Sequence, residues 1–299
     1  MGYQDFLEML KAHVAEQSDG TLRVRIASII KNNRQPLDSL VLLGPGENTA
    51  PAIYLEPYYK DYLSGTPLGT VAQQILDFYQ EHRAKGALDL SFFTEYARAK
   101  PQLACRIVNY EKNQSLLASV PHRRFLDLAL IYYCRIDHPA FGRAGITIQQ
   151  THLEMWGISE SELHETACTN TCSQVPYELL DIVQMMREVT GILLDESYMR
   201  ELPMYVLTNT EKSYGAAMIF FPAVLEKVAA TLGEDYYVLP SSIHECMILP
   251  LSSAHDMTVS DLEHMVCEIN EKHVAYDEVL SNSVYRYSCS GKVLGIAGR

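Results

Sequence analysis

The sequence has no long hydrophobic run and no recognisable leader. Its longest apolar run, 214-YGAAMIFFPAVL-225, contains a proline and is shorter than the about 20 residues that a transmembrane helix needs. The first residues, MGYQDFLEML, lack a basic segment followed by an apolar core, so no secretory signal is expected. These absences argue against a membrane protein or a secreted protein.

The chain also lacks a cationic excess. It has 24 lysines and arginines against 37 acidic residues, a formal net charge of −13. Because a phosphate-binding surface must be basic, nucleic acid is not an expected partner. Seven cysteines without a signal are typical of reduced cytosolic thiols. We therefore expect a soluble, acidic, cytoplasmic protein that binds another protein or a small molecule and has no membrane partner.

Common catalytic and cofactor signatures are missing as well. No GxxxxGK[ST], GxGxxG, GxSxG or two-histidine zinc protease motif is found, and 44-GPGEN-48 contains a proline and lacks the third glycine. Cys168 and Cys172 have helical i, i+4 spacing, but without a nearby histidine pair they are better interpreted as small buried thiols. The sequence thus predicts no cofactor and no metal site, and it leaves open whether the protein is an enzyme.

The overall composition is that of a folded globular protein. Hydrophobic residues make up 47% and charged residues 20% of the 299 residues, enough for one large or two ordinary domains. Hydrophobic periodicity predicts strands at 22–31, 40–43, 52–55, 103–109, 125–134, 146–149, 204–208, 236–239, 243–249 and 284–288. It predicts helices at 3–16, after Thr66-Pro67, at 112–118, after Ser159, at 222–232 and at 259–272.

Local signals support several of these boundaries. Ser159 and Glu162 form a capping box, while Pro222 and Gly233 bracket a helix. Thr66 can cap the helix that Pro67 opens, and Gly157 after Trp156 indicates a helix end. The runs 22–31 and 40–43 are expected to pair as a hairpin. Short turns between paired strands imply an α+β fold of mainly antiparallel sheets flanked by helices, built from successive strand–strand–helix units. A break at 119–124 separates two predicted lobes, 1–120 and 121–299, and the least structured segment is 190–203.

The stretch 236-YYVLPSSIHECMILPL-251 contains the candidate catalytic residues Ser242, His244 and Glu245. On a regular strand His244 and Glu245 would point to opposite faces, so they would not form a dyad. His244 and Cys246 would share a face, about 6.6–6.8 Å apart, which is too far for a thiolate–imidazole pair. We therefore favour structural roles, with Ser242 shaping a turn and His244 bonded to backbone.

A polar and aromatic cluster over 31–62 is the candidate binding region. Amide side chains beside tyrosines are typical of binding grooves, although asparagine also fits turns and tyrosine also suits half-exposed helices. The candidate ligand- or partner-binding residues are Asn32, Asn33, Asn48, Tyr54 and Tyr58, together with Trp156. Trp156 is the only tryptophan, and core packing against the sheet is favoured for it over a ligand platform.

Several stretches carry a family resemblance: 30-IKNN-33, 52-AIYLEPYYKDY-62, 91-SFFTEY-96, 121-PHRRFLDLALIYY-133, 152-HLEMWGISESELHETACTNT-171, 204-MYVLTN-209 and 237-YVLPSSIHE-245. Their order resembles domain-of-unknown-function family 5688 of gut-dwelling anaerobic bacteria over nearly the whole chain. WGISESELHETA and YVLPSSIHE also resemble family 1444 over the C-terminal two thirds. The resemblance implies a bacterial cytosolic protein from accessory or mobile DNA, and it implies no reaction, cofactor or catalytic residue.

Three hypotheses follow. The leading one is a non-catalytic α+β protein that binds a partner protein or a small ligand. The alternative is a hydrolase-type enzyme that uses His244 with Glu245, Ser242 or Cys246. A third is a factor whose acidic surface blocks a nucleic-acid-binding protein. The position of His244, in a cleft or in the core, distinguishes the first two.

Overall fold

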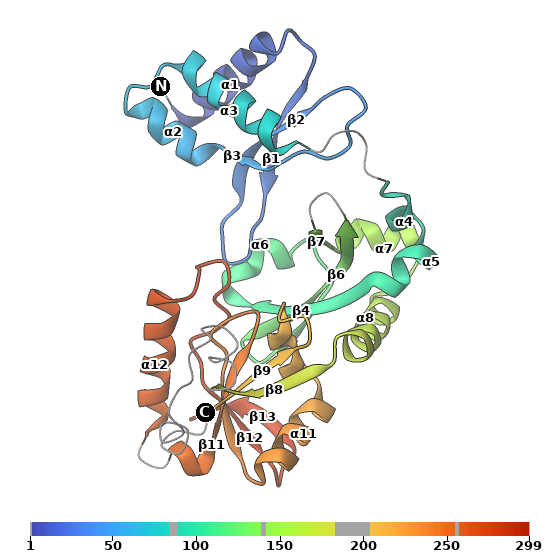
Figure 1. Ribbon diagram of the computed structural model, residues 1–299, viewed down its shortest axis with the longest axis vertical. Helices are drawn as coiled ribbons and strands as arrows, with labels where there is room; N and C mark the ends of the chain where they lie inside the picture. The colour runs from blue at the N-terminus through green and yellow to red at the C-terminus, as the bar shows by residue number, and fades with distance from the viewer. Residues whose placement is uncertain (1, 84–88, 139–141, 183–203, 255–256, 299) are drawn as a thin grey trace. The chain divides into compact units, whose positions relative to one another are not determined.

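The computed structural model describes residues 2–83, 89–138, 142–182, 204–254 and 257–298, so the predicted unstructured segment 190–203 lies outside the described residues (Figure 1). The chain divides into two compact units, Met1–Phe92 and Phe93–Arg299. This division falls earlier than the boundary that we expected at residue 120. The reason is that β4 (Leu103–Asn109) pairs with β6 (Leu128–His138) and so belongs to a sheet of the second unit.

The first unit combines a small antiparallel sheet with three helices. Its core contains Phe6, Leu10, Leu40, Ile75 and Tyr79, all fully buried. The apolar residues of each helix recur at three- and four-residue intervals, which places them on the face that packs against the sheet. The elements are α1 (Tyr3–Gln17), β1 (Arg23–Ile29), β2 (Leu37–Leu43), β3 (Ile53–Tyr54), α2 (Leu55–Leu63) and α3 (Leu68–His82).

The predicted hairpin of the first unit is confirmed. β1 and β2 pair antiparallel from Arg23 opposite Leu43 to Ile29 opposite Leu37, and β3 pairs with the other edge of β2. The prediction that Thr66 caps α3 is wrong. Pro67 occupies the cap position with an extended backbone, while the N–H of Thr66 still bonds to Asp61 at the end of α2.

The second unit begins with short helices and a four-stranded sheet. β4 pairs with one edge of β6, and β5 and β7 pair with successive parts of its other edge. The strand predicted at 125–134 is divided by a tight turn at Leu126–Asp127, where Leu126 has φ of 57°. The elements are α4 (Ser91–Thr94), α5 (Tyr96–Ala99), η1 (Lys100–Gln102), η2 (Glu111–Asn113), α6 (Gln114–Leu117), β5 (His122–Phe125), β7 (Gly142–Thr147), α7 (Gln150–Trp156) and α8 (Glu160–Gln174), with α4 at the division between the units.

A six-stranded antiparallel sheet follows, in the order β13-β12-β10-β11-β9-β8. Leu239 packs with Leu262 and Val266 of α12, whereas Tyr236 donates a hydrogen bond to Leu225 of α11. Because side chains alternate along a strand, α11 and α12 cover opposite faces. The elements are β8 (Tyr177–Asp181), β9 (Tyr205–Asn209), η3 (Gly215–Phe220), α11 (Pro222–Leu232), β10 (Tyr236–Leu239), β11 (Cys246–Pro250), η4 (Leu251–Ala254), α12 (Val259–Lys272), β12 (Tyr285–Ser288) and β13 (Val293–Ile296).

The helix boundaries that rested on capping signals agree with the structure. Ser159 accepts a hydrogen bond from the N–H of Glu162 at the start of α8, at 3.2 Å. Pro222 opens α11, and Gly233 ends it with φ of 77°, a conformation that favours glycine. By contrast, 284–288 is not the last strand, because β13 pairs with β12. β13 is short and contains a glycine, so its hydrophobic pattern is weak.

The fold class is α+β with antiparallel sheets, as predicted. Every strand pairing in the described part of the chain is antiparallel. No helix within these residues is long and apolar enough to cross a membrane.

Candidate functional site

His244 and Glu245 lie in a bend before β11 and not on a strand. β11 begins at Cys246, so the prediction of a strand over 243–249 is wrong for its first three residues. Ser242 instead makes an isolated antiparallel bridge with Val279, which holds the segment away from the neighbouring strand. Side-chain alternation therefore does not decide where His244 and Glu245 point.

The imidazole of His244 lies between a backbone amide and a carboxylate. Its Nδ1 accepts a hydrogen bond from the N–H of Tyr214 at 3.3 Å, and its Nε2 is 3.6 Å from Glu278 Oε1. The ring also stacks on the ring of Tyr214, with centroids 5.6 Å apart. The side chain is 28% exposed, so His244 occupies neither a dry core nor an open cleft.

Ser242 bonds to the backbone of this segment, and Glu245 is partly buried beside it. Ser242 Oγ accepts the backbone N–H of His244 at 3.0 Å. Burial raises the pKa of Glu245, while the charge of His244 and a hydrogen bond with Ser242 oppose that rise. Burial also raises the pKa of the Cys246 thiol, which is fully inaccessible. Both ring nitrogens of His244 thus face groups other than the Ser242 hydroxyl, and the arrangement is not that of an activated nucleophile.

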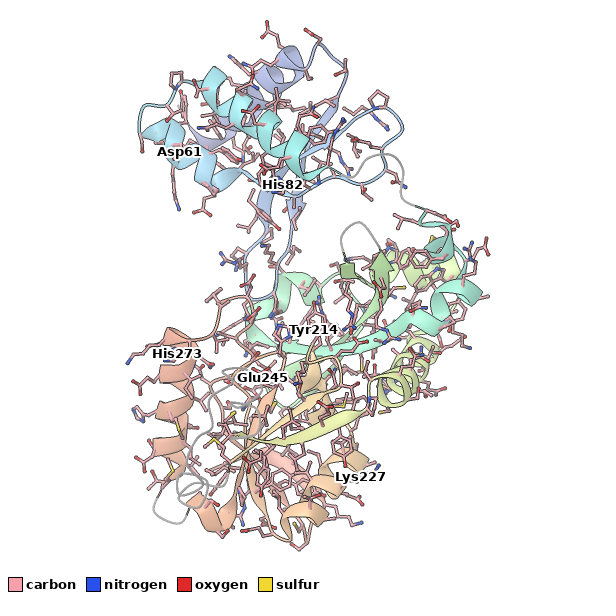
Figure 2. The ribbon with its side chains drawn as sticks, in the orientation of Figure 1. Asp61, His82, Tyr214, Lys227, Glu245 and His273 are labelled. Carbon is pink, nitrogen blue, oxygen red and sulfur yellow. The ribbon has the colours of Figure 1, made fainter. Side chains whose placement is uncertain are left out.

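A cavity of about 340 Å³ lies on the other side of Tyr214, in the second unit. Figure 2 labels Tyr214, which comes from the loop after β9, and Glu245, which precedes β11. The cavity is formed where the β6–β7 hairpin meets the 209–214 loop. Its lining consists of Gln102, Tyr133, Arg135, Ile136, Asp137, Arg143, Ala144, Gly145, Glu211, Ser213 and Tyr214.

The 209–214 loop is held by the side chain of Asn209. Its Oδ1 accepts the N–H groups of Glu211 and Ser213, and its Nδ2 donates to the carbonyl of Ser213 at 2.9 Å. Gly215 follows, and a Cβ there would lie 2.7 Å from the carbonyl oxygen of His244. The close approach of two backbone segments therefore requires glycine and fixes the position of Tyr214.

Aromatic rings and guanidinium groups from three elements meet at this cavity. The rings of Tyr133 and Tyr214 lie edge to face, 5.2 Å apart, and the Arg106 guanidinium is 4.9 Å from the Tyr214 ring centroid. Gly145 makes room for Tyr133, since a Cβ would approach that ring to 2.9 Å. The aromatic side of the site is thus packed by ring–ring and cation–π contacts.

Charged groups of both signs lie along the polar side of the cavity. Glu211 is 3.7 Å from Arg135 and 3.9 Å from Arg143, and Arg135 also donates to Gln174. Asp137 stands opposite Arg143 in the β6–β7 ladder. Two cations and two anions therefore line the same space, and their charges sum to zero.

The candidate binding residues of the first unit separate into two groups. Tyr54 lines a cavity of about 410 Å³ together with Lys31, whose Nζ is 4.5 Å from the Tyr54 ring centroid. The full lining consists of Tyr3, Lys31, Arg34, Pro36, Leu37, Asp38, Tyr54, Glu56 and Pro57. Asn32, Asn33, Asn48 and Tyr58 are not in this lining.

Those four residues have other positions. Asn33 is buried at a left-handed turn with φ of 59°, and Asn32 is partly buried beside it. Asn48 is exposed in the loop after β2. Tyr58 lies half-buried on α2 and packs against the core of the unit. The turn positions match the structural interpretation that the sequence left open for asparagine.

Trp156 packs between short helices and not against the sheet. Its indole Nε1 donates to the carbonyl of Phe93 at 2.8 Å, and its ring contacts the rings of Phe93, Tyr96 and His152. The polar atom of the indole therefore has an internal partner. Gly157, with φ of 67°, ends α7 directly after it, as the sequence indicated.

Sequence reasoning missed the residues around the Tyr214 cavity. Arg135 and Arg143 stand apart in the chain and meet only through the register of β6 with β7. Asn209, Ser213 and Gly215 are turn-forming residue types around Tyr214, and this clustering is a signal that the sequence contains. Within the described ranges, no group of three His, Cys, Asp or Glu side chains is placed to hold a metal ion.

The whole sequence was compared with known protein families, curated proteins and solved structures. Neither the curated proteins nor the solved structures contain a significant match. A family model described as "Family of unknown function (DUF5688)" matches residues 3–289. The resemblance to family 1444 stays a prediction. Because the match covers nearly the entire chain, this protein belongs to the DUF5688 family.

Proposed function

We propose that this is a non-catalytic binding protein and that the cavity beside Tyr214 holds a small zwitterionic ligand with a planar or apolar part, such as an amino acid or a short peptide. The convergence of two tyrosine rings with charges of both signs, on a volume of about 340 Å³, carries the proposal. Specific sites combine an apolar surface with a few oriented polar groups. A location in the bacterial cytoplasm, which cell fractionation would test, is part of the same proposal.

The charges of the lining favour a ligand that itself carries both signs. A carboxylate would pair with Arg143, which is well exposed, and an ammonium group would pair with Asp137 or Glu211. A ligand with a single charge would use the lining charges of one sign only. The aromatic rings of Tyr133 and Tyr214 would contact the remaining part of the ligand.

Titration calorimetry with phenylalanine and phenylalanine-containing dipeptides tests this function. Phenylpropionate and phenethylamine, which each lack one charge, are the matched ligands. Arg143→Gln and Tyr214→Ala should each weaken binding about tenfold or more, or about 1.4 kcal/mol. Arg124→Gln changes an exposed arginine of β5 outside the cavity and should leave affinity unchanged.

Two results would contradict the proposal. One is the absence of binding by every zwitterion of the panel. The other is equal binding of the singly charged analogues, because that would show that the paired charges of the lining are not used.

A hydrolase-type enzyme is the second candidate. It is favoured by the 3.6 Å approach of Glu278 Oε1 to His244 Nε2, beside the partly buried carboxyl of Glu245. In this function Glu278 would orient the imidazole, and Ser242 would move to meet it. Ester and peptide hydrolysis assays on wild type, His244→Ala and Glu278→Gln test the idea. Turnover that survives His244→Ala would eliminate it.

The first-unit cavity at Tyr54 is a further candidate for partner binding. Lys31 and Arg34 give it cationic groups, and Asp38 and Glu56 give it anionic ones. A pull-down with wild type and Tyr54→Ala tests this role. A partner that is retained equally by both would count against it.

A further inference from the structure

One side of α8 carries two thiols and an imidazole. His164, Cys168 and Cys172 follow at four-residue intervals, so they lie along the same side of the helix. α8 packs alongside β4, where Cys105 is buried (Figure 1). The backbone N–H of Cys105 donates to Thr171 Oγ1 at 3.0 Å and fixes the helix against the strand at this point.

Cys105 and Cys168 interact across this helix–strand contact. Cys105 Sγ is 3.4 Å from Thr171 Oγ1, and Thr171 lies three residues after Cys168 on α8. Cys168 Sγ lies 3.6 Å from His164 Nδ1, and the hydroxyl of Tyr132 is 2.9 Å from the same nitrogen. Cys168 is thus surrounded by polar groups, unlike an ordinary core thiol.

The surroundings make the two thiols chemically unequal. The hydrogen bond with Cys168, together with burial, raises the pKa of Cys105. The same hydrogen bond lowers the pKa of Cys168, and the charge of Arg123 assists against the opposing effect of burial. Burial raises the pKa of Cys172. Reactive thiols are found in partly exposed, electropositive surroundings, which Cys168 has and Cys105 lacks.

We propose that Cys168 and Cys105 form a peroxide-reactive thiol pair that closes a disulfide between α8 and β4. The Cys168 thiolate attacks hydrogen peroxide, the O–O bond breaks, and sulfenic acid and hydroxide form. The Cys105 thiol then attacks the sulfenic sulfur, a sulfur–sulfur bond forms, and water leaves with the proton of Cys105. The hydroxide takes up the proton that the Cys168 thiol released on ionising, so peroxide is reduced to two waters as the two thiols are oxidised.

Cys172 provides a matched control, because it lies one turn from Cys168 on the same helix and is exposed. The reduced full chain would be treated with a small molar excess of hydrogen peroxide and analysed by intact and peptide mass spectrometry. We expect a mass lower by two hydrogens and a peptide that links Cys105 to the segment containing Cys168. Cys172→Ser should form this link as wild type does, whereas Cys168→Ser should not form it.

A variant of Cys105 identifies the first product. Cys105→Ala should accumulate a sulfenic acid on Cys168 that dimedone traps. Because Cys105 is buried and its replacement could disturb folding, the alkylation rates of the wild-type thiols are measured as well. Cys168 should react faster with iodoacetamide than Cys172, despite its lower exposure. A Cys105 link that persists in Cys168→Ser, or alkylation of Cys172 ahead of Cys168, would overturn the proposal.

Discussion

Glu47 is a buried carboxylate that ties the loop after β2 to the end of α3. It is 7% exposed and accepts three hydrogen bonds: from the N–H of Gly44 at 2.8 Å, from the hydroxyl of Tyr79 at 2.5 Å and from Arg83 at 3.2 Å. The change Glu47→Ala removes all three acceptor contacts. It should therefore destabilise the first unit more than any change at an exposed glutamate.

The magnitude follows from these contacts. Hydrogen bonds to a charged group contribute about 1.5–3 kcal/mol each, and they are not additive within one network. Gly44 N is also 3.1 Å from Tyr79 Oη, so these two groups partly satisfy each other once the carboxylate is gone. We expect Glu47→Ala to lower the free energy of unfolding by about 3 kcal/mol. Glu47→Gln keeps one acceptor oxygen and should cost about half as much.

The effect of Glu47 also depends on pH. Burial alone would raise the pKa of Glu47, but hydrogen bonds from Tyr79 and Gly44 and the charge of Arg83 outweigh it and hold the pKa below its ordinary value. A carboxyl whose pKa is lowered by folding stabilises the protein above its unfolded pKa, and this contribution is lost as the pH falls through the folded pKa. The difference in the free energy of unfolding between wild type and Glu47→Gln should therefore be constant near neutrality and shrink below about pH 4.

Hydrogen exchange with mass spectrometry is the appropriate assay, because it reports on α3 separately from the second unit. A loss of about 3 kcal/mol in the free energy of unfolding corresponds to amide hydrogen exchange about a hundredfold faster in α3 peptides. Peptides of β12 serve as the internal reference. Glu56→Gln is the matched control, since Glu56 is exposed and its ion pair with Lys60 on the same helix is exposed as well. Exchange of α3 that rises less than about threefold in Glu47→Ala would refute this reasoning.

Two further substitutions test the second unit. Gly215→Ala places a Cβ 2.7 Å from the carbonyl oxygen of His244, a backbone atom that cannot rotate away, and should destabilise by about 2–3 kcal/mol in urea unfolding. Unchanged stability would show that the 209–215 loop shifts freely. Tyr285→Phe removes a 2.5 Å hydrogen bond to Asp127 and should lower the thermal midpoint through a loss of about 2 kcal/mol. An unaltered midpoint would mean that Ser281 and Ser283 satisfy Asp127 by themselves.

Elements with strong local signals could be predicted from the sequence. α11 and α12 have the predicted bounds, because an apolar stripe and clear end signals act within one helix. The 243–249 prediction was wrong at its start for a tertiary reason. The bridge of Ser242 to Val279 and the packing of Gly215 on His244 bend the segment, and both partners are distant in the chain. The thiol pair could be predicted only in part. The helical spacing of His164, Cys168 and Cys172 can be read from the sequence, but the position of Cys105 beside α8 cannot.

The sequence by itself determined the α+β class, most helix boundaries and the acidic charge, since these depend on composition and on contacts a few residues apart. Only the tertiary structure decided where chemistry can occur. Strand register brings Arg135 and Arg143 to one cavity, and a loop folded around Asn209 turns Tyr214 between that cavity and His244. Such positions depend on pairings between residues far apart in the chain, and local sequence patterns do not specify which distant residues meet.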